Sequence, residues 1–113
     1  MALYDNLPVF KVSYDLLRRI YTICGPMERC FRFTLGERLQ NDTIEILKNI
    51  YRANTHYEKA QYLETAREHL ETVRLLLRVA HEGKQISIKH YIGVCEMTES
   101  ISKQLTAWGR TVK

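Results

Sequence analysis

Apolar residues recur every three or four positions over most of this chain, which is the spacing of one face of an α-helix. The clearest seam runs through Leu63, Ala66, Leu70, Val73, Leu77 and Ala80. This seam predicts a helix over about residues 58–82 that packs into the core of a helical bundle. Gly83 comes directly after the segment and is predicted to end the helix, because glycine is common just past a helix terminus.

The same segment also carries apolar residues outside the seam. With the seam facing the core, Leu75 and Val79 project from the opposite side, where a monomeric bundle should be polar. Arg74 and Arg78 are four residues apart between the two apolar faces, so both guanidinium groups could bind one phosphate or one carboxylate. The sequence therefore predicts a helix with a core on one side and a partner on the other.

Three further helices are predicted over about residues 8–24, 33–53 and 87–108. In the last of them, the predicted inward positions are Ile88, Tyr91, Cys95, Thr98, Ile101, Leu105 and Trp108. No segment shows the sustained alternation of a β-strand. Four helices joined by short links are typical of an antiparallel up-down-up-down bundle, so we predict an all-α fold with a single domain over residues 1–113.

Helix boundaries are predicted from residues with known capping behaviour. Gly25 is expected to take the left-handed conformation that ends the first helix, and Asn54 the same at the end of the second. Thr34 and Glu37 match the S/T-x-x-E capping box that opens a helix. Ser87 is predicted to cap the fourth helix.

The first helix also carries more apolar surface than one core can take. One stripe is formed by Phe10, Tyr14, Leu17, Tyr21 and Cys24, and a second by Val9, Val12, Leu16, Ile20 and Ile23. From the second stripe we predict that Val12, Leu16, Ile20 and Ile23 join Leu75 and Val79 in an interface between copies of the chain. Assembly around a symmetry axis would bring together one copy of each arginine from every chain, so the positive charge near the axis would grow with the number of chains.

Composition narrows the class of protein. The 113 residues are 45% hydrophobic and 27% charged, which is typical of one globular domain. The net charge of +4 mildly favours anionic partners. The chain has three cysteines, no C-x-x-C motif and no leading apolar segment, so we expect a cytoplasmic protein. No apolar run approaches the roughly 18 residues of a membrane span, and no membrane partner is expected.

Motifs that carry chemistry are missing from the sequence. No carboxylate has a histidine three residues later, and there is no H-E-x-x-H or glycine-rich phosphate loop. We therefore expect no catalytic residues, no metal and no cofactor. His69 falls at the edge of the inward face and is interpreted as an interfacial histidine with a hydrogen-bond partner.

Basic residues allow two interpretations. Arg67, Arg74 and His81 repeat every seven residues along one flank of the third helix, and Glu71 is spaced to pair with both arginines on a solvated face. Alternatively, the flank is the rim of a binding surface, since Arg78 lies beside the outward apolar pair. Charge placement adds further candidate contacts to nucleic acid or to a polymerase at Arg18, Arg19, Lys84 and Lys89.

Several short motifs together resemble a known family. Leu7–Lys11 reads LPVFK, Phe33–Leu39 reads FTLGERL, the second predicted helix closes with Asn49–Asn54, and Trp108 lies near the end of the chain. In these motifs the chain resembles the accessory variability determinant (Avd) proteins of diversity-generating retroelements. A wider group of similar four-helix proteins includes the products of intervening sequences in bacterial large-subunit rRNA genes.

The resemblance implies a non-enzymatic, positively charged, ring-like homopentamer that is cytoplasmic and encoded by a bacterium, an archaeon or a phage. Such a protein binds the reverse transcriptase of the retroelement and nucleic acid, chiefly the template RNA and possibly DNA. The complex supports error-prone copying at adenines. Arg74 and Arg78 match two arginines that lie four apart within an apolar run of the third helix in that family.

Two other functions remain open from the sequence. One is an intervening-sequence-type protein that binds RNA without a reverse transcriptase. The other is a small enzyme with a ligand pocket between the bundle helices. A reverse transcriptase gene and paired template and variable repeats beside this gene would support the retroelement interpretation.

Overall fold

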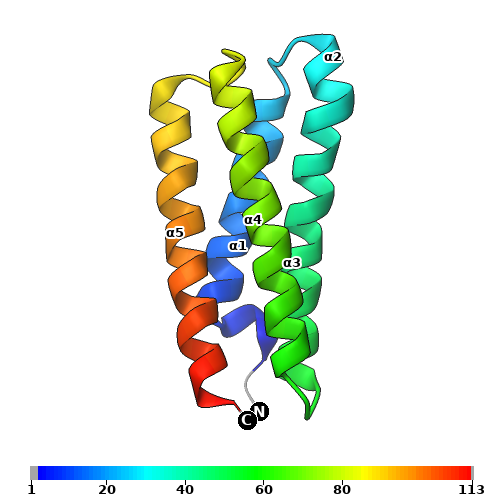
Figure 1. The fold of residues 1–113 in the computed structure, drawn as a ribbon, viewed down its shortest axis with the longest axis vertical. Helices are drawn as coiled ribbons and strands as arrows, with labels where there is room; N and C mark the ends of the chain where they lie inside the picture. The colour runs from blue at the N-terminus through cyan, green and yellow to red at the C-terminus, as the bar shows by residue number, and fades with distance from the viewer. Residues whose placement is uncertain (1–2, 113) are drawn as a thin grey trace.

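Four long helices run antiparallel to their chain neighbours in one elongated bundle of 43 × 22 × 20 Å (Figure 1). They are α1 (Pro8–Cys24), α3 (Glu37–Thr55), α4 (Ala60–Glu82) and α5 (Ile88–Thr111) in this computed structural model, which describes residues 3–112. Around the bundle, α1 packs on α3 and α5, and α4 packs on the same two helices from the other side. Helices and turns account for the regular structure of the described residues, which confirms the predicted all-α class.

The seam predicted for the third helix is confirmed on α4. Its buried residues are Leu63, Ala66, Leu70, Val73, Leu77 and Ala80, the six positions that step by three and four. Each buried leucine side chain contributes about 1.5–3 kcal/mol relative to an exposed one. The seam therefore fixes which side of α4 faces α3 and α5, and it turns Leu75 and Val79 outward.

The predicted interface on the first helix is wrong for most of its residues. Leu16 and Ile20 have no exposed surface, and Ile23 is 4% exposed, because this stripe of α1 is the one that faces the core. Val12 is half-buried and packs against the same core. None of the first three can contact another copy of the chain. The outward aromatic residues of α1 are instead Tyr14 and Tyr21, which are about half exposed.

The inward face of α5 is rotated from the predicted one. Val94, Thr98, Ile101 and Leu105 are its buried residues, whereas Tyr91, Cys95 and Trp108 lie half-buried at the edges. Ile88 was predicted to point inward but is 60% exposed. The predicted cap is confirmed, since the backbone N–H of His90 donates to Ser87 Oγ at 3.2 Å.

The connection between α1 and α3 is more helical than predicted. After the short α2 (Arg29–Phe31), a π-helical turn η2 (Arg32–Gly36) leads directly into α3. The predicted capping box does not form, because Thr34 lies inside this helical stretch and its hydroxyl donates to the Cys30 carbonyl at 2.6 Å. Gly25 is right-handed, so the predicted left-handed cap is also wrong.

Lys84, in the α4–α5 loop, has a left-handed backbone conformation with φ 61°. It is the one residue with a positive φ within residues 3–112. Its N–H donates to the His81 carbonyl at 3.0 Å, and the N–H of Gln85 donates to the Ala80 carbonyl at 2.8 Å. These two bonds form the Schellman motif, which satisfies the last carbonyls of α4. The predicted stop at Gly83 is confirmed, but the predicted left-handed stop at Asn54 is wrong, because α3 continues to Thr55.

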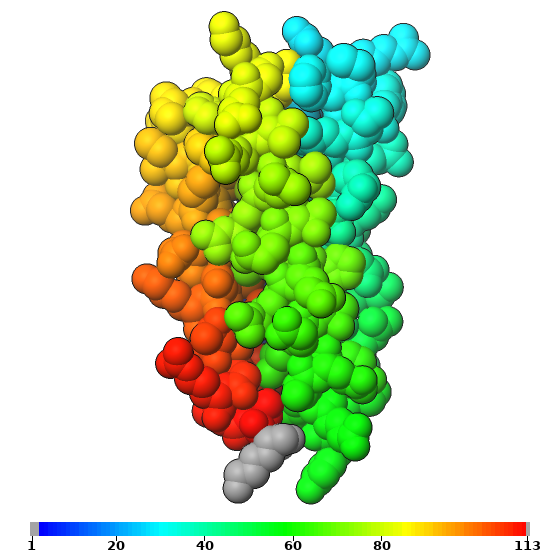
Figure 2. Space-filling model, in the orientation of Figure 1, coloured from blue at the N-terminus to red at the C-terminus, as the bar shows by residue number. Residues whose placement is uncertain are grey.

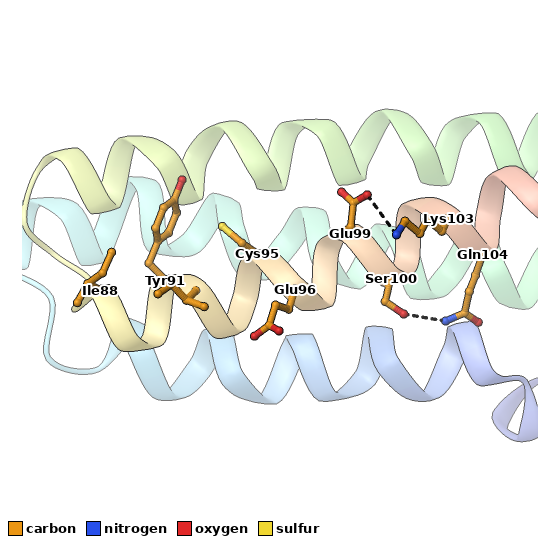
Figure 3. A pocket seen from close by; sticks show the side chains of 9 residues that line it. Ile88, Tyr91, Cys95, Glu96, Glu99, Ser100, Lys103 and Gln104 are labelled. Carbon is orange, nitrogen blue, oxygen red and sulfur yellow. Dashed lines mark hydrogen bonds and ion pairs between the residues drawn. The ribbon is translucent and has the colours of Figure 1, made fainter.

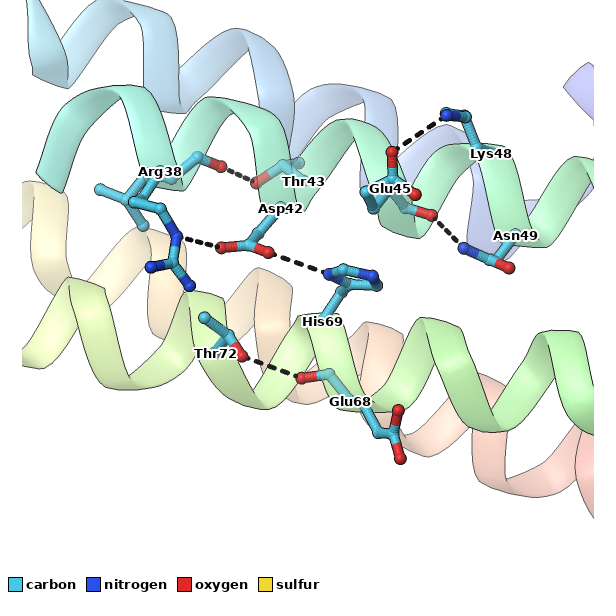
Figure 4. Close-up of polar contacts among 10 residues, drawn as sticks. Arg38, Asp42, Thr43, Glu45, Lys48, Asn49, Glu68, His69 and Thr72 are labelled. Carbon is cyan, nitrogen blue, oxygen red and sulfur yellow. Dashed lines mark hydrogen bonds and ion pairs between the residues drawn. The ribbon is translucent and has the colours of Figure 1, made fainter. Parts of the chain in front are cut away.

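A polar bridge joins α3 to α4 within the apolar packing (Figure 4). The buried carboxylate of Asp42 is 2.9 Å from His69 Nδ1, and its other oxygen is 3.5 Å from Arg38 Nε. A buried carboxylate needs such partners because desolvation of an isolated charge is costly. His69 is thus an interfacial histidine with a hydrogen-bond partner, as the sequence predicted.

Candidate partner-binding surface on α4 and α5

A groove of about 480 Å³ lies between the outward sides of α4 and α5. Its lining includes Arg74, Leu75 and Arg78 from α4, and Tyr91, Cys95 and Glu99 from α5. A shallower hollow of about 730 Å³ continues along α5 on the other side of Tyr91, Cys95 and Glu99 (Figure 3). Because the same three residues line both hollows, the two form one continuous surface on this side of the molecule.

Leu75 lines the groove and Ile88 and Ile92 line the hollow beside it, whereas Val79 lies four residues after Leu75 on the outward side of α4. All four aliphatic side chains are exposed to solvent. Leu75 and Val79 of α4 are 60% and 42% exposed, and Ile88 and Ile92 of α5 are 60% and 54% exposed. We call these four residues the outer apolar face. The outward orientation predicted for Leu75 and Val79 is confirmed. A cluster of exposed aliphatic side chains is typical of a protein–protein contact.

Arg74 and Arg78 point into the groove region and both have carboxylate partners. Arg74 Nη2 is 3.2 Å from Glu99 on α5, and its Nη1 is 3.5 Å from Glu71. Arg78 Nε is 3.3 Å from Glu82. The local charge of the two arginines is therefore balanced, and these exposed pairs are each worth about 0–1 kcal/mol, so the arginines can exchange partners at little cost.

The prediction that Glu71 pairs with both Arg67 and Arg74 on a solvated face is confirmed only for Arg74. Glu71 pairs with Arg74 as expected, but Arg67 pairs with Glu64 at 3.5 Å instead. Glu99 was not anticipated, because it lies 25 positions from Arg74 and only the packing of α5 on α4 brings it close. The pairing does not exclude a binding rim, since the outer apolar face borders these arginines.

Tyr91 is the aromatic residue that lines the groove. The ring of Tyr91 stacks on His81 with centroids 4.2 Å apart and planes 5° from parallel. Burial raises the pKa of the Tyr91 hydroxyl, and the neighbouring Cys95 thiol raises it further. Tyr91 therefore stays protonated at neutral pH and can donate a hydrogen bond to a bound partner.

The remaining predicted basic residues do not gather in this groove. Arg18 and Arg19 line a different hollow, between α1 and α5, with Met97. Arg67 lies further along α4, beside Arg110. Lys84 and Lys89 are exposed at the end of the bundle where α4 passes into α5. The structure thus separates the seven candidates into several surfaces.

Sequence reasoning missed Ile92 as part of the outer apolar face. The signal was present, since Ile88 and Ile92 are four residues apart like Leu75 and Val79. Within residues 3–112, no three His, Cys, Asp or Glu side chains lie close enough to hold a metal ion together. No helix of the described chain is long and apolar enough to cross a membrane.

Comparisons with known proteins give the family of the chain. A structure described as a protein of unknown function from the S23 ribosomal protein family of Bacteroides thetaiotaomicron superposes with a TM-score of 0.84 at 18% identity, covering 96% of this chain and 100% of that one. No curated protein matches the sequence significantly. The family model described as bAvd-like matches residues 9–112, nearly the whole bundle. The chain therefore belongs to the bAvd-like family of Avd proteins.

Proposed function

We propose that this protein is a non-catalytic accessory protein of a diversity-generating retroelement. It assembles with copies of itself and binds both the reverse transcriptase and the template RNA of the element, so as to support mutagenic copying. The observation that carries the proposal is the bAvd-like family match over residues 9–112. The outer apolar face and the adjoining arginines supply the surface that such a role needs.

Contact between copies is assigned to the outer apolar face. Leu75, Val79, Ile88 and Ile92 would each lose water on association, which favours assembly by roughly 25 cal/mol per Å² of apolar surface. Of the interface residues predicted on α1, only the half-buried Val12 remains accessible, beside the exposed Tyr14 and Tyr21. The pentameric ring is carried over from the resemblance to the Avd family.

The polymerase contact is assigned to Arg74 and Arg78. Both arginines form ion pairs with carboxylates at an exposed site. Carboxylates of a protein partner can therefore replace Glu99, Glu71 or Glu82 at little cost in free energy. Guanidinium groups suit this exchange, since they bind carboxylates through two parallel hydrogen bonds. The groove beside them holds the Tyr91 hydroxyl as a further donor.

Template RNA binding is attributed to the summed positive charge of the assembly. A single chain has a net charge of +4, and a ring of copies would multiply that charge around one axis. Neutralising phosphates releases counterions, so the affinity should fall steeply as salt is raised.

The proposal is tested by co-expressing the chain with the reverse transcriptase encoded beside its gene. Replacing Arg74 and Arg78 by alanine should reduce co-purification of the polymerase about tenfold or more, because hot-spot arginines contribute about 2 kcal/mol or more each. The matched control replaces Lys11 and Arg110, two exposed cations near the opposite end of the bundle. The control should retain the polymerase.

Both variants should keep the helical circular dichroism signal and the assembly state of the wild type. Unchanged polymerase binding by the Arg74→Ala/Arg78→Ala variant would contradict the assignment. Loss of helical signal in that variant would mean that the arginines serve the fold instead. A gene neighbourhood without a reverse transcriptase would favour the intervening-sequence-type alternative.

A further inference from the structure

A second basic surface lies at the end of the bundle where the chain passes from α1 through α2 and η2 into α3. Phe33 is 56% exposed on the π-helical turn η2. The guanidinium carbon of Arg32 is 5.2 Å from the centroid of its ring, and that of Arg29 is 5.8 Å away. One exposed ring thus lies against two cations.

These cations differ from Arg74 and Arg78 in their partners. Among residues 3–112, neither Arg29, Arg32 nor Lys84 lies within ion-pair distance of a carboxylate. Arg32 donates one hydrogen bond, to the Gly25 carbonyl at 3.1 Å, which orients its guanidinium group and leaves its other donors available. Two guanidinium groups near one ring repel each other unless an anion lies close by.

Lys84 belongs to the same end of the molecule. The backbone N–H of Glu28 donates to Gln85 Oε1 at 2.8 Å, which joins the α1–α2 connection to the α4–α5 loop. Arg29 directly follows Glu28 in the sequence, and Lys84 directly precedes Gln85. Figure 2 shows the two segments, cyan and yellow, projecting from one end of the bundle. A glycine would be unstrained at the left-handed position, yet a lysine with φ 61° occupies it.

We infer that Phe33, Arg29, Arg32 and Lys84 form a contact site for single-stranded nucleic acid, which we call the end cluster. The cations bind backbone phosphates, and the exposed ring stacks on an unpaired base. An exposed aromatic ring beside cations that have no carboxylate partner is the combination by which proteins bind single strands, and it favours a nucleic acid over a purely acidic protein surface. π-Helical turns are frequent at functional sites, and here the turn presents Phe33 outward while Leu35 and Gly36 face the core.

The end cluster deepens the proposed function, because it names where template RNA would be held, but it does not depend on a reverse transcriptase. The end cluster would also place RNA binding and polymerase binding on different surfaces of the molecule. The ion-paired groove on α4 and α5 suits a protein partner, whereas the end cluster has the uncompensated charge that phosphate binding needs.

The test measures binding of the purified full chain to a fluorescein-labelled oligouridine of about 20 nucleotides, long enough for one or more stacking sites, by anisotropy over a range of salt. Replacing Arg29 and Arg32 by glutamine should lower the slope of log affinity against log salt by about 1.4, because each single-strand phosphate contact contributes about 0.7. The matched control, Lys11→Gln/Arg110→Gln, removes the same charge from the other end and should bind more tightly than the cluster variant.

Phe33 separates stacking from simple charge attraction. Phe33→Ala should weaken binding about fivefold or more with the salt slope unchanged, and Phe33→Trp should restore it, since stacking needs only an aromatic face. Double-stranded RNA of the same length should show no effect of Phe33→Ala, because its bases are already stacked.

Several outcomes would overturn the inference. Phe33→Ala with wild-type affinity, or equal losses in the cluster and control double variants, would show that no defined site exists at this end. A changed mass of the Phe33→Ala assembly would assign the ring to an interface between copies. Loss of polymerase co-purification with unchanged RNA affinity would make the surface a protein-binding site. If only the Arg74→Ala/Arg78→Ala variant lost its partners, the proposed function would stand without the end cluster.

Discussion

Lys84 is the non-glycine residue with a positive φ within residues 3–112. It holds the left-handed position of the Schellman motif after α4 with φ 61°. A residue with a Cβ loses about 1–2 kcal/mol there, and glycine does not. The sequence placed the helix end correctly at Gly83 but did not show that Lys84 is the left-handed residue. Gly83 is needed for a different reason, because the Phe31 ring lies 3.1 Å from where a Cβ on Gly83 would be.

Replacing Lys84 by glycine should therefore raise the free energy of unfolding by up to about 1 kcal/mol. Urea unfolding followed by circular dichroism measures the change. Lys89→Gly is the matched control, because Lys89 is an exposed lysine in the first turn of α5 and glycine in a helix is destabilising by about 0.5–1 kcal/mol. Equal destabilisation by both substitutions would contradict the strain assigned to Lys84.

Cys24 gives the protein a pH-dependent stability. Burial raises the pKa of its thiol above 9.0, although a hydrogen bond with Gln40 opposes part of this shift. The folded chain therefore holds its proton at a pH where the unfolded chain has lost it. It follows that the stabilisation is complete below pH 9.0 and is lost as the pH rises through the higher pKa of the folded state.

In the wild type, the free energy of unfolding should fall as the pH rises above 9.0, and Cys24→Ser should make this fall less steep. Urea unfolding under reducing conditions at several pH values measures the slope. Some slope should remain, because burial also raises the pKa of Tyr91. Cys30→Ser is the control, since Cys30 is exposed. A slope that is the same in all three proteins would mean that the Cys24 thiol does not contribute.

At the scale of elements, α4 is the helix that the sequence predicts best. Its seam is unbroken, and each of the six positions of the seam is buried. On α1 two apolar stripes fit a helix equally well. The inward side of α1 also contains a polar residue, Ser13, which is buried and whose hydroxyl donates to the Val9 carbonyl at 2.7 Å, so polarity does not identify the inward side. Only the positions of α3 and α5 decide between the stripes, so α1 was predicted as a helix but with the wrong face outward.

The connection before α3 could not be predicted for a similar reason. Thr34 and Glu37 match a local capping pattern, but packing of Leu35 and Gly36 against the core favours a π-helical turn in the same place. Arg32 and Phe33 of the end cluster lie on this turn and Arg29 lies on α2 directly before it, so these three residues were missed, whereas Lys84 was already a predicted contact. Arg29, Arg32 and Phe33 follow helical spacing in the sequence, which was the available signal.

The two sides of α4 should respond differently to truncation. Leu77→Ala should lower the free energy of unfolding by about 2–5 kcal/mol, because Leu77 is 1% exposed in the core. Leu75→Ala should change it by less than about 0.5 kcal/mol in dilute protein, since Leu75 faces solvent in the single chain. Comparable losses from both substitutions, measured by urea unfolding, would show that α4 is oriented differently from this account.

At the scale of the whole molecule, charge and apolar surface occupy different places. The outer apolar face lies along α4 and α5, and its arginines are neutralised by Glu71, Glu82 and Glu99. Within residues 3–112, the cations of the end cluster have no carboxylate within ion-pair distance. Association through the side of the bundle would bring copies of the end cluster around one axis, where their potentials add. The weak charge of one chain would then become a strong local field.

The mass of the purified protein in solution tests this account most directly. Multi-angle light scattering should give several times the 13.4 kDa of one chain, five times if the assembly matches the Avd family. Replacing Leu75 and Val79 by glutamate should reduce the mass to that of a single folded chain, whereas Tyr57→Glu, at a loop residue that is 99% exposed, should leave it unchanged. A wild-type mass of 13.4 kDa, or a Leu75→Glu/Val79→Glu variant with the wild-type mass, would contradict the assignment of the outer apolar face to contact between copies.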